Sequence, residues 1–79
     1  MSAAPLRLLI VDDEPQIRRF LRTSLAAHGY DVIEADSGAA ALRVATTARP
    51  DVMVLDLGLP DQDGTEVIRR IREWSPLPI

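Results

Sequence analysis

Residues 51–56 read Asp-Val-Met-Val-Leu-Asp, a short apolar run that stops abruptly at an acid. Residues 6–11, Leu-Arg-Leu-Leu-Ile-Val, form a second such run, which stops at Asp12 and Asp13. Nearly continuous apolar runs are typical of parallel strands that are covered on both faces. If the two strands are neighbours, their carboxyl ends lie at the same edge of the sheet. The sequence therefore predicts that Asp12, Asp13 and Asp56 meet there.

A helical pattern follows the first run. Asp13 is placed to be its N-cap, with Gln16 as the capping-box partner and Pro15 in the first turn, and Gly29 is placed to end it. Its apolar residues recur at helical spacing. They predict one buried stripe, made of Ile17, Phe20, Leu21, Ser24 and Leu25. The arginines of this helix fall largely outside the stripe and are interpreted as a solvated face.

Residues 30–35 are short and partly alternating, which predicts an edge strand. Asp36 or Ser37 then caps an Ala-rich helix that ends at Pro50. A narrow stripe suited to close packing on a sheet is made of Ala41, Leu42, Ala45 and Ala48.

A third helix is predicted after the second acidic run. The pattern Asp63-x-x-Glu66 indicates a capping box at its start. Its predicted inner face is made of Val67, Ile68, Ile71 and Trp74. Residues 76–79, Pro-Leu-Pro-Ile, are expected to approach a fourth strand.

Strands that alternate with helices form β-α-β units with right-handed crossovers. The predicted fold class is α/β: a flavodoxin-like, doubly wound parallel sheet. Its complete strand order is 2-1-3-4-5, and we expect this chain to stop after about three strands and three helices. Residues 1–5 are expected to be a disordered lead and residues 6–79 a single incomplete domain.

The composition narrows the possible functions. The chain has 79 residues, a net charge of −3 and no cysteine, which excludes disulfides and thiolate chemistry. Its mild acidity argues against binding nucleic acid by itself. No apolar stretch approaches the roughly 18 residues of a membrane span, and the first residues lack the pattern of a signal peptide. We therefore expect a cytoplasmic protein.

Carboxylates in one crevice raise each other's pKa or recruit a cation. An all-oxygen site with room for water suits Mg²⁺, which commonly shares its shell with a phosphoryl group. Asp56 stands alone at a strand end and is the better candidate for a nucleophile that forms an aspartyl phosphate, with Asp12 and Asp13 as the metal pair. The backbone carbonyl of Gly58 could also turn toward the ion.

Two other interpretations stay open at this point. Acids at strand ends often only cap the following helix or face water. A phosphatase or mutase of the haloacid-dehalogenase type also uses an aspartyl nucleophile and Mg²⁺, but it carries Asp-x-Asp, whereas Asp12 and Asp13 are adjacent. A calcium loop of the EF-hand type is excluded because Leu59 and Arg70 would occupy its first and twelfth positions.

The motifs Leu-Ile-Val-Asp-Asp-Glu at 9–14 and Val-Leu-Asp-Leu-Gly-Leu-Pro at 54–60, followed by Asp63-Gly64, resemble the receiver domain of a bacterial two-component response regulator. The resemblance implies that Asp56 receives a phosphoryl group from a histidine kinase and that the module is not a turnover enzyme. It also implies that Asp13, Asp56 and the Gly58 carbonyl bind Mg²⁺ directly, while Asp12 acts mainly through water.

A finer resemblance, in residues 16–23, 55–61 and 72–75, is to the Kdp-type regulators of the OmpR family. Members of that group bind DNA through a C-terminal domain, which is not present here, and control transcription. The family also uses a Ser or Thr after strand four and a Lys after strand five, and neither can be assigned to this chain. We therefore expect weak Mg²⁺ binding and poor or absent phosphorylation. The alternative function is a phosphorylation-incompetent structural or dimerising piece.

A missing fourth strand has a physical consequence for residues 52–55. They would form an unpaired apolar edge, which is a template for association with another chain. We expect either a homodimer or swapped assembly through this edge, or that the chain was cut from a longer one.

Overall fold

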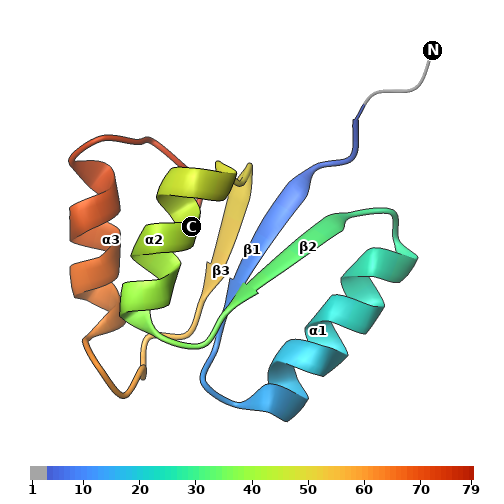
Figure 1. Ribbon diagram of the computed structural model, residues 1–79, viewed down its shortest axis with the longest axis horizontal. Coiled ribbons are helices and arrows are strands. Elements are labelled where there is room, and N and C mark those ends of the chain that lie inside the picture. Colours follow the sequence, from blue (N-terminus) through green and yellow to red (C-terminus); the bar gives the residue numbers. More distant parts are fainter. Residues whose placement is uncertain (1–3) are drawn as a thin grey trace.

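The computed structural model describes residues 4–79, so the first three residues of the predicted lead lie outside the described part. Three parallel strands form one sheet in the order β2-β1-β3 (Figure 1). The strands are β1 (Arg7–Val11), β2 (Asp31–Ala35) and β3 (Val52–Leu55). The helices are α1 (Pro15–Ala27), α2 (Gly38–Ala48) and α3 (Gly64–Arg72). The predicted fold class and the central position of the first strand are confirmed.

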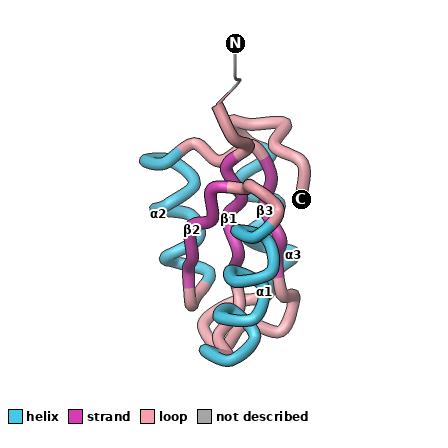
Figure 2. Tube along the Cα trace, turned by 90° about the vertical axis from the view of Figure 1, so that its right-hand side faces the viewer, coloured by secondary structure: helices cyan, strands magenta, loops and turns pink. Residues whose placement is uncertain are grey.

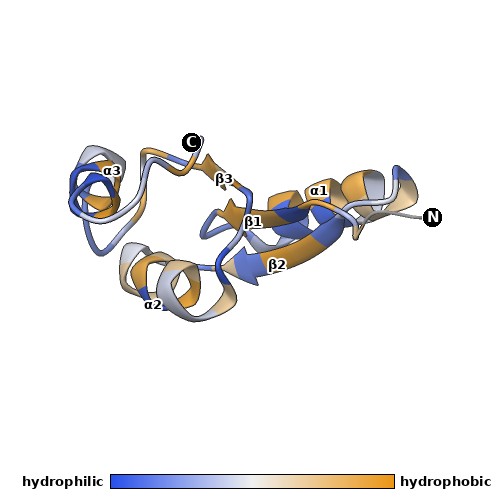
Figure 3. Ribbon diagram, turned by 90° about the horizontal axis from the view of Figure 1, so that it is seen from above, coloured by the Kyte–Doolittle hydropathy of each residue, from blue (hydrophilic) through white to orange (hydrophobic). Residues whose placement is uncertain are grey.

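The two halves of the chain cover opposite faces of the sheet. The chain moves from β1 to β2 in one direction and from β2 across to β3 in the other. Because both crossovers are right-handed, the reversal puts α1 on one face and α2 on the other. Figure 3 shows this arrangement, with α2 and α3 on one side of the strands and α1 on the other. Figure 2 shows the strands from the side, with β1 between β2 and β3.

The main hydrophobic core lies between the sheet and the pair α2 and α3. In β1, Leu9 and Val11 face this core, and Met53 joins them from β3. The predicted inner faces are largely confirmed, because Ala41 and Ala45 of α2 are buried. From α3 and its flanking loops come Leu59, Val67, Ile71 and Leu77.

The opposite face departs from the prediction. No residue of α1 is buried, and Phe20 is 69% exposed, so the predicted buried stripe is wrong. The physical reason is that α1 lies alone on this face against β1 and β2, while a cleft separates it from β3. For the same reason Val54 is 42% exposed, and β3 is not covered on both faces as its apolar run predicts.

Trp74 is also not a core residue. Its side chain is 53% exposed and lies just past the end of α3 at Arg72. Trp74 lines a surface pocket together with Arg49 and Pro50.

The helix caps follow the sequence only in part. Ser37 caps α2 by accepting a hydrogen bond from the Ala40 amide, as predicted. The N-cap of α1 is Glu14 rather than Asp13, and it makes no side-chain capping bond, so the predicted box with Gln16 does not form. The helix ends at Gly29 as predicted, with a φ of 89° that suits glycine.

Only one of the two hydrogen bonds of the second predicted capping box forms. Asp63 accepts the amide of Thr65, as an N-cap does. Glu66, the expected reach-back partner, bonds instead to the guanidinium groups of Arg69 and Arg70. These hydrogen bonds lower the pKa of Glu66 to about 2.

The last residues of the chain lie beside β3. The carbonyl of Pro78 accepts a hydrogen bond of 2.9 Å from the Met53 amide, and Leu77 is buried. Arg72 holds this segment by donating to the carbonyls of Ser75 and Leu77. Residues 76–79 are expected from the sequence to approach a fourth strand. Within residues 4–79 the sheet has three strands, but this segment lies beside β3 and bonds to Met53, so the expectation of an unpaired β3 edge is wrong at that residue.

Candidate metal centre

The acids predicted to share a site directly follow two neighbouring strands. Val11 and Leu55 are partners in the register of β1 and β3, so the next residues, Asp12 and Asp56, leave the sheet side by side. The Asp56 amide donates to the Val11 carbonyl, and the Asp12 amide donates to Ala35 of β2. The backbone amide of each acid therefore still bonds to the neighbouring strand, and this bond fixes the position of its Cα.

The three carboxylates converge. One oxygen from each of Asp12, Asp13 and Asp56 lies within 4.8 Å of the other two. Asp13 is exposed, whereas Asp12 and Asp56 are half-buried. The structure therefore has these acids together at one edge of the sheet, as the sequence predicted.

This donor set fits a hard divalent cation. Mg²⁺ binds oxygen at about 2.1 Å, so two oxygens on opposite sides of one ion lie about 4.2 Å apart. The 4.8 Å limit lies above this span, so the carboxylates must move inward for all three to bind one ion directly. The exposure of Asp13 leaves room for the waters that Mg²⁺ keeps in its shell.

Backbone amides orient two of the three carboxylates. The Gly58 amide donates to Asp56 Oδ1 at 3.0 Å, and the Glu14 amide donates to Asp12 Oδ1 at 2.9 Å. Each bond reaches back over two residues and closes a tight turn after the strand. Gly58 therefore contacts Asp56 through its N–H. Ligation by its carbonyl stays a prediction.

A cleft opens from the acids. It has a volume of about 410 Å³ and runs between α1 and β3, with Asp12 and Asp56 at one end and Ile17 and Val54 among its apolar walls. The site is therefore accessible to a ligand larger than an ion.

Asp61, in the loop after β3, holds that loop against α2. Its carboxylate accepts the amides of Gly38 and Ala39 at 2.8 and 3.0 Å. The bond from Gly38 is the main cause that lowers the pKa of Asp61. Sequence reasoning missed this role, because nothing near Asp61 in the sequence indicates its partner.

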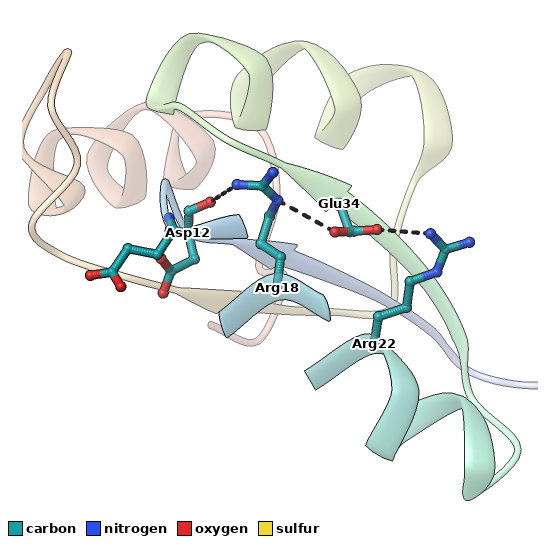
Figure 4. Close-up of polar contacts among 5 residues, drawn as sticks. Asp12, Arg18, Arg22 and Glu34 are labelled. Carbon is teal, nitrogen blue, oxygen red and sulfur yellow. Dashed lines mark hydrogen bonds and ion pairs between the residues drawn. The ribbon is translucent and has the colours of Figure 1, made fainter. Parts of the chain in front are cut away.

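A second missed feature is a chain of charged contacts behind Asp12. Arg18 donates to the Asp12 backbone carbonyl and pairs with Glu34, which also pairs with Arg22 (Figure 4). The interpretation of the α1 arginines as a solvated face is wrong for Arg18, whose side chain is 18% exposed. The sequence signal that could have indicated this contact is Glu34, an acid within the short strand β2.

A parallel α/β sheet with acids at the adjacent ends of its first and third strands is the architecture of a response-regulator receiver. The family model described as the response regulator receiver domain matches residues 8–79, and the chain belongs to that family. The adjacent Asp12 and Asp13 are thus a receiver pair, and the haloacid-dehalogenase interpretation is set aside.

The resemblance to Kdp-type regulators is confirmed. Over 72 residues the chain is 53% identical to the KDP operon transcriptional regulatory protein KdpE of Escherichia coli K12. It is 51% identical to the transcriptional regulatory protein KdpE of Mycobacterium tuberculosis H37Rv over the same length. Each alignment covers 91% of this chain and 32% of the relative, so the chain spans about a third of the length of these curated relatives.

Solved receivers share the backbone. The chemotaxis response regulator CheY4 of Vibrio cholerae superposes with a TM-score of 0.86 at 34% identity, covering 89% of this chain and 58% of that one. The response regulator TrrA of Thermotoga maritima, solved in complex with Mg²⁺-BeF, gives 0.82 at 38% identity, covering 86% and 59%. Within residues 4–79, every helix is too short or too polar to cross a membrane.

Proposed function

We propose that Asp56 is the phosphoacceptor of a two-component response regulator and receives its phosphoryl group from a sensor histidine kinase. Asp12, Asp13, Asp56 and the Gly58 carbonyl would hold the Mg²⁺ that assists the transfer. The observation that carries the proposal is the convergence of the three carboxylates within 4.8 Å at the ends of β1 and β3. The similar TrrA receiver, which was solved with Mg²⁺-BeF bound, supports it.

The proposed reaction transfers a phosphoryl group from a histidine nitrogen of the kinase to a carboxylate oxygen of Asp56. A carboxylate oxygen of Asp56 forms a bond to phosphorus while the bond from phosphorus to the kinase imidazole nitrogen breaks, and that nitrogen keeps the electron pair. Mg²⁺ would neutralise charge on the phosphoryl oxygens. The Gly58 amide orients the Asp56 carboxylate through Oδ1, and the backbone bond to Val11 fixes its origin.

We further propose a cytoplasmic signalling role rather than enzymatic turnover. The similar KdpE proteins are named as transcriptional regulators, which supports transcription control as the output. In this proposal, DNA binding resides outside these residues, in agreement with the net charge of −3. The domain limits proposed are a lead over 1–5 and an incomplete receiver over 6–79.

The test is incubation of the chain with Mg²⁺ and acetyl phosphate, followed by intact mass measurement. The expected result is a gain of one phosphoryl group in the wild type and none in Asp56→Asn. Asp36→Asn is the matched control, since it removes an exposed acid at the end of β2 that does not join the cluster, and it should still gain the group. Equal labelling of wild type and Asp56→Asn would overturn the assignment.

A second candidate is a receiver fragment that acts without phosphorylation, through self-association. The outward side of β3 supports it, because Val54 is exposed there. No mass gain, together with a concentration-dependent dimer in light scattering, would favour this function. A monomer at all concentrations would contradict the association.

A further inference from the structure

We propose that Arg18 is a positioning residue for the metal centre. It would hold the peptide bond between Asp12 and Asp13 so that both carboxylates turn toward Asp56. This inference rests on the proposed metal-assisted function and adds to it a residue that has no contact with the ion. Arg18 lies on the first turn of α1, between the acidic pair and β2 (Figure 4).

The contacts of Arg18 are specific and shielded. Its Nη1 donates to the backbone oxygen of Asp12 at 2.7 Å, and its Nε lies 3.4 Å from Glu34 Oε1. The side chains of Arg18 and Glu34 are only 18% and 26% exposed. The rigid guanidinium plane presents separate donors to two elements at once, which a single ammonium group does less well.

The bond acts on two acids through one peptide plane. The carbonyl of Asp12 and the N–H of Asp13 belong to the same planar unit. Fixing the carbonyl direction therefore fixes the start of the Asp13 backbone as well. Asp12 is already held at its amide by Ala35 and at its carboxylate by Glu14. The bond from Arg18 to the Asp12 carbonyl adds a third restraint on this residue.

The charges explain the role of Glu34 in positioning Arg18. A cation near three carboxylates would compete with Mg²⁺, because like charges repel. Glu34 pairs with Arg18 and offsets its charge, and Arg22 binds the other oxygen of Glu34 at 3.1 Å. Arg18 thus has two opposing effects on metal affinity. Its charge weakens binding, whereas its hydrogen bond to Asp12 strengthens binding by orienting the ligands.

The two effects predict opposite changes in Mg²⁺ affinity when Arg18 is replaced. Mg²⁺ affinity of the chain is measured by isothermal titration calorimetry for wild type, Arg18→Gln and Arg22→Gln. Positioning predicts that Arg18→Gln weakens Mg²⁺ binding by about tenfold, as the loss of an outer-shell partner typically does. Arg22→Gln removes the same charge from the same helix and the same Glu34 pair, and should stay within about twofold of wild type. Charge alone would instead make Arg18→Gln bind more tightly.

A spectroscopic readout separates orientation from stability. The Asp13 amide nitrogen shift in a ¹H–¹⁵N spectrum reports the hydrogen bond to the preceding carbonyl. It should move in Arg18→Gln and stay in place in Arg22→Gln. Arg18→Lys should show intermediate affinity. If Arg18→Gln does not fold, Arg18→Lys decides the question, and wild-type affinity there overturns the proposal.

The failure of this inference is distinct from the failure of the proposed function. Wild-type binding that is lost in Asp13→Asn and unchanged in Arg18→Gln overturns the role of Arg18 alone. Wild-type protein that does not bind Mg²⁺ overturns the metal centre itself, and the positioning role with it.

Discussion

Asp61 accepts the backbone amide of Gly38 across 2.8 Å, so the loop that follows β3 caps a helix 23 residues earlier in the chain. Asp56 opens the same loop. The site is therefore attached to α2 by a carboxylate that takes no part in the acidic cluster.

This link predicts a pH-dependent stability. The amides of Gly38 and Ala39 lower the pKa of Asp61 from its ordinary 3.8. A depressed folded-state pKa contributes stability that is present above about pH 3.8 and is lost as the pH falls through the folded-state value. Asp61→Asn should therefore unfold at lower urea than wild type at pH 7, and the difference between the two midpoints should shrink below pH 3.8. A constant difference down to pH 2 would contradict the assignment.

Gly64 predicts a steric effect next to the site. A Cβ there would lie 2.7 Å from the Leu57 Cα and 3.2 Å from the Asp56 carbonyl oxygen, both backbone atoms. Gly64→Ala should cost about 1–3 kcal/mol of unfolding free energy, as overpacking typically does. It should also weaken Mg²⁺ binding, because the chain beside Asp56 must shift.

Gly58→Ala is the control for this effect. Its added Cβ would meet nothing closer than the Asp56 Oδ1, at 3.7 Å, which is an ordinary contact. Urea unfolding should place this variant near wild type. If both variants lose the same stability, the crowding argument is wrong.

The helices bury side chains on one face of the sheet more fully than on the other. Truncating a side chain should therefore cost more stability on the first face than on the second. Ile71 is fully buried on the inner face of α3, and Ile71→Ala should lose about 2–5 kcal/mol by leaving a cavity. Phe20 is 69% exposed on α1. Phe20→Ala should stay within about 0.5 kcal/mol of wild type, as surface substitutions usually do. Chemical denaturation measures both, and a large loss at Phe20 would mean that α1 covers more of the sheet than the structure has.

The acidic cluster predicts stabilisation by metal. A ligand that binds only the folded state at a hundred times its Kd adds about 2.7 kcal/mol. The melting temperature of wild type should therefore rise with Mg²⁺ and return when a chelator removes the ion. Asp13→Asn should lose most of this rise. Asp36→Asn, which neutralises an acid at the end of β2 outside the cluster, should keep it. An equal rise in both variants would indicate nonspecific ion binding.

Sequence patterns predicted the strand ends from local signals, because abrupt changes from apolar residues to acids mark them. The flavodoxin-like strand order, in which β1 lies between β2 and β3, then brings the ends of β1 and β3 together. The same patterns failed for Phe20 and Trp74. Spacing indicates which residues share a helix face, but it does not indicate how much of the sheet that helix reaches.

The amino-acid sequence by itself determined the receiver fold and the identity of the converging acids. Only the tertiary structure decided that Arg18 turns to Asp12 and Glu34, and that Asp61 caps α2. The reason is physical. Strand and helix propensities act over a few neighbouring residues, whereas these contacts join groups on separate elements, and their partners are fixed only when the elements pack.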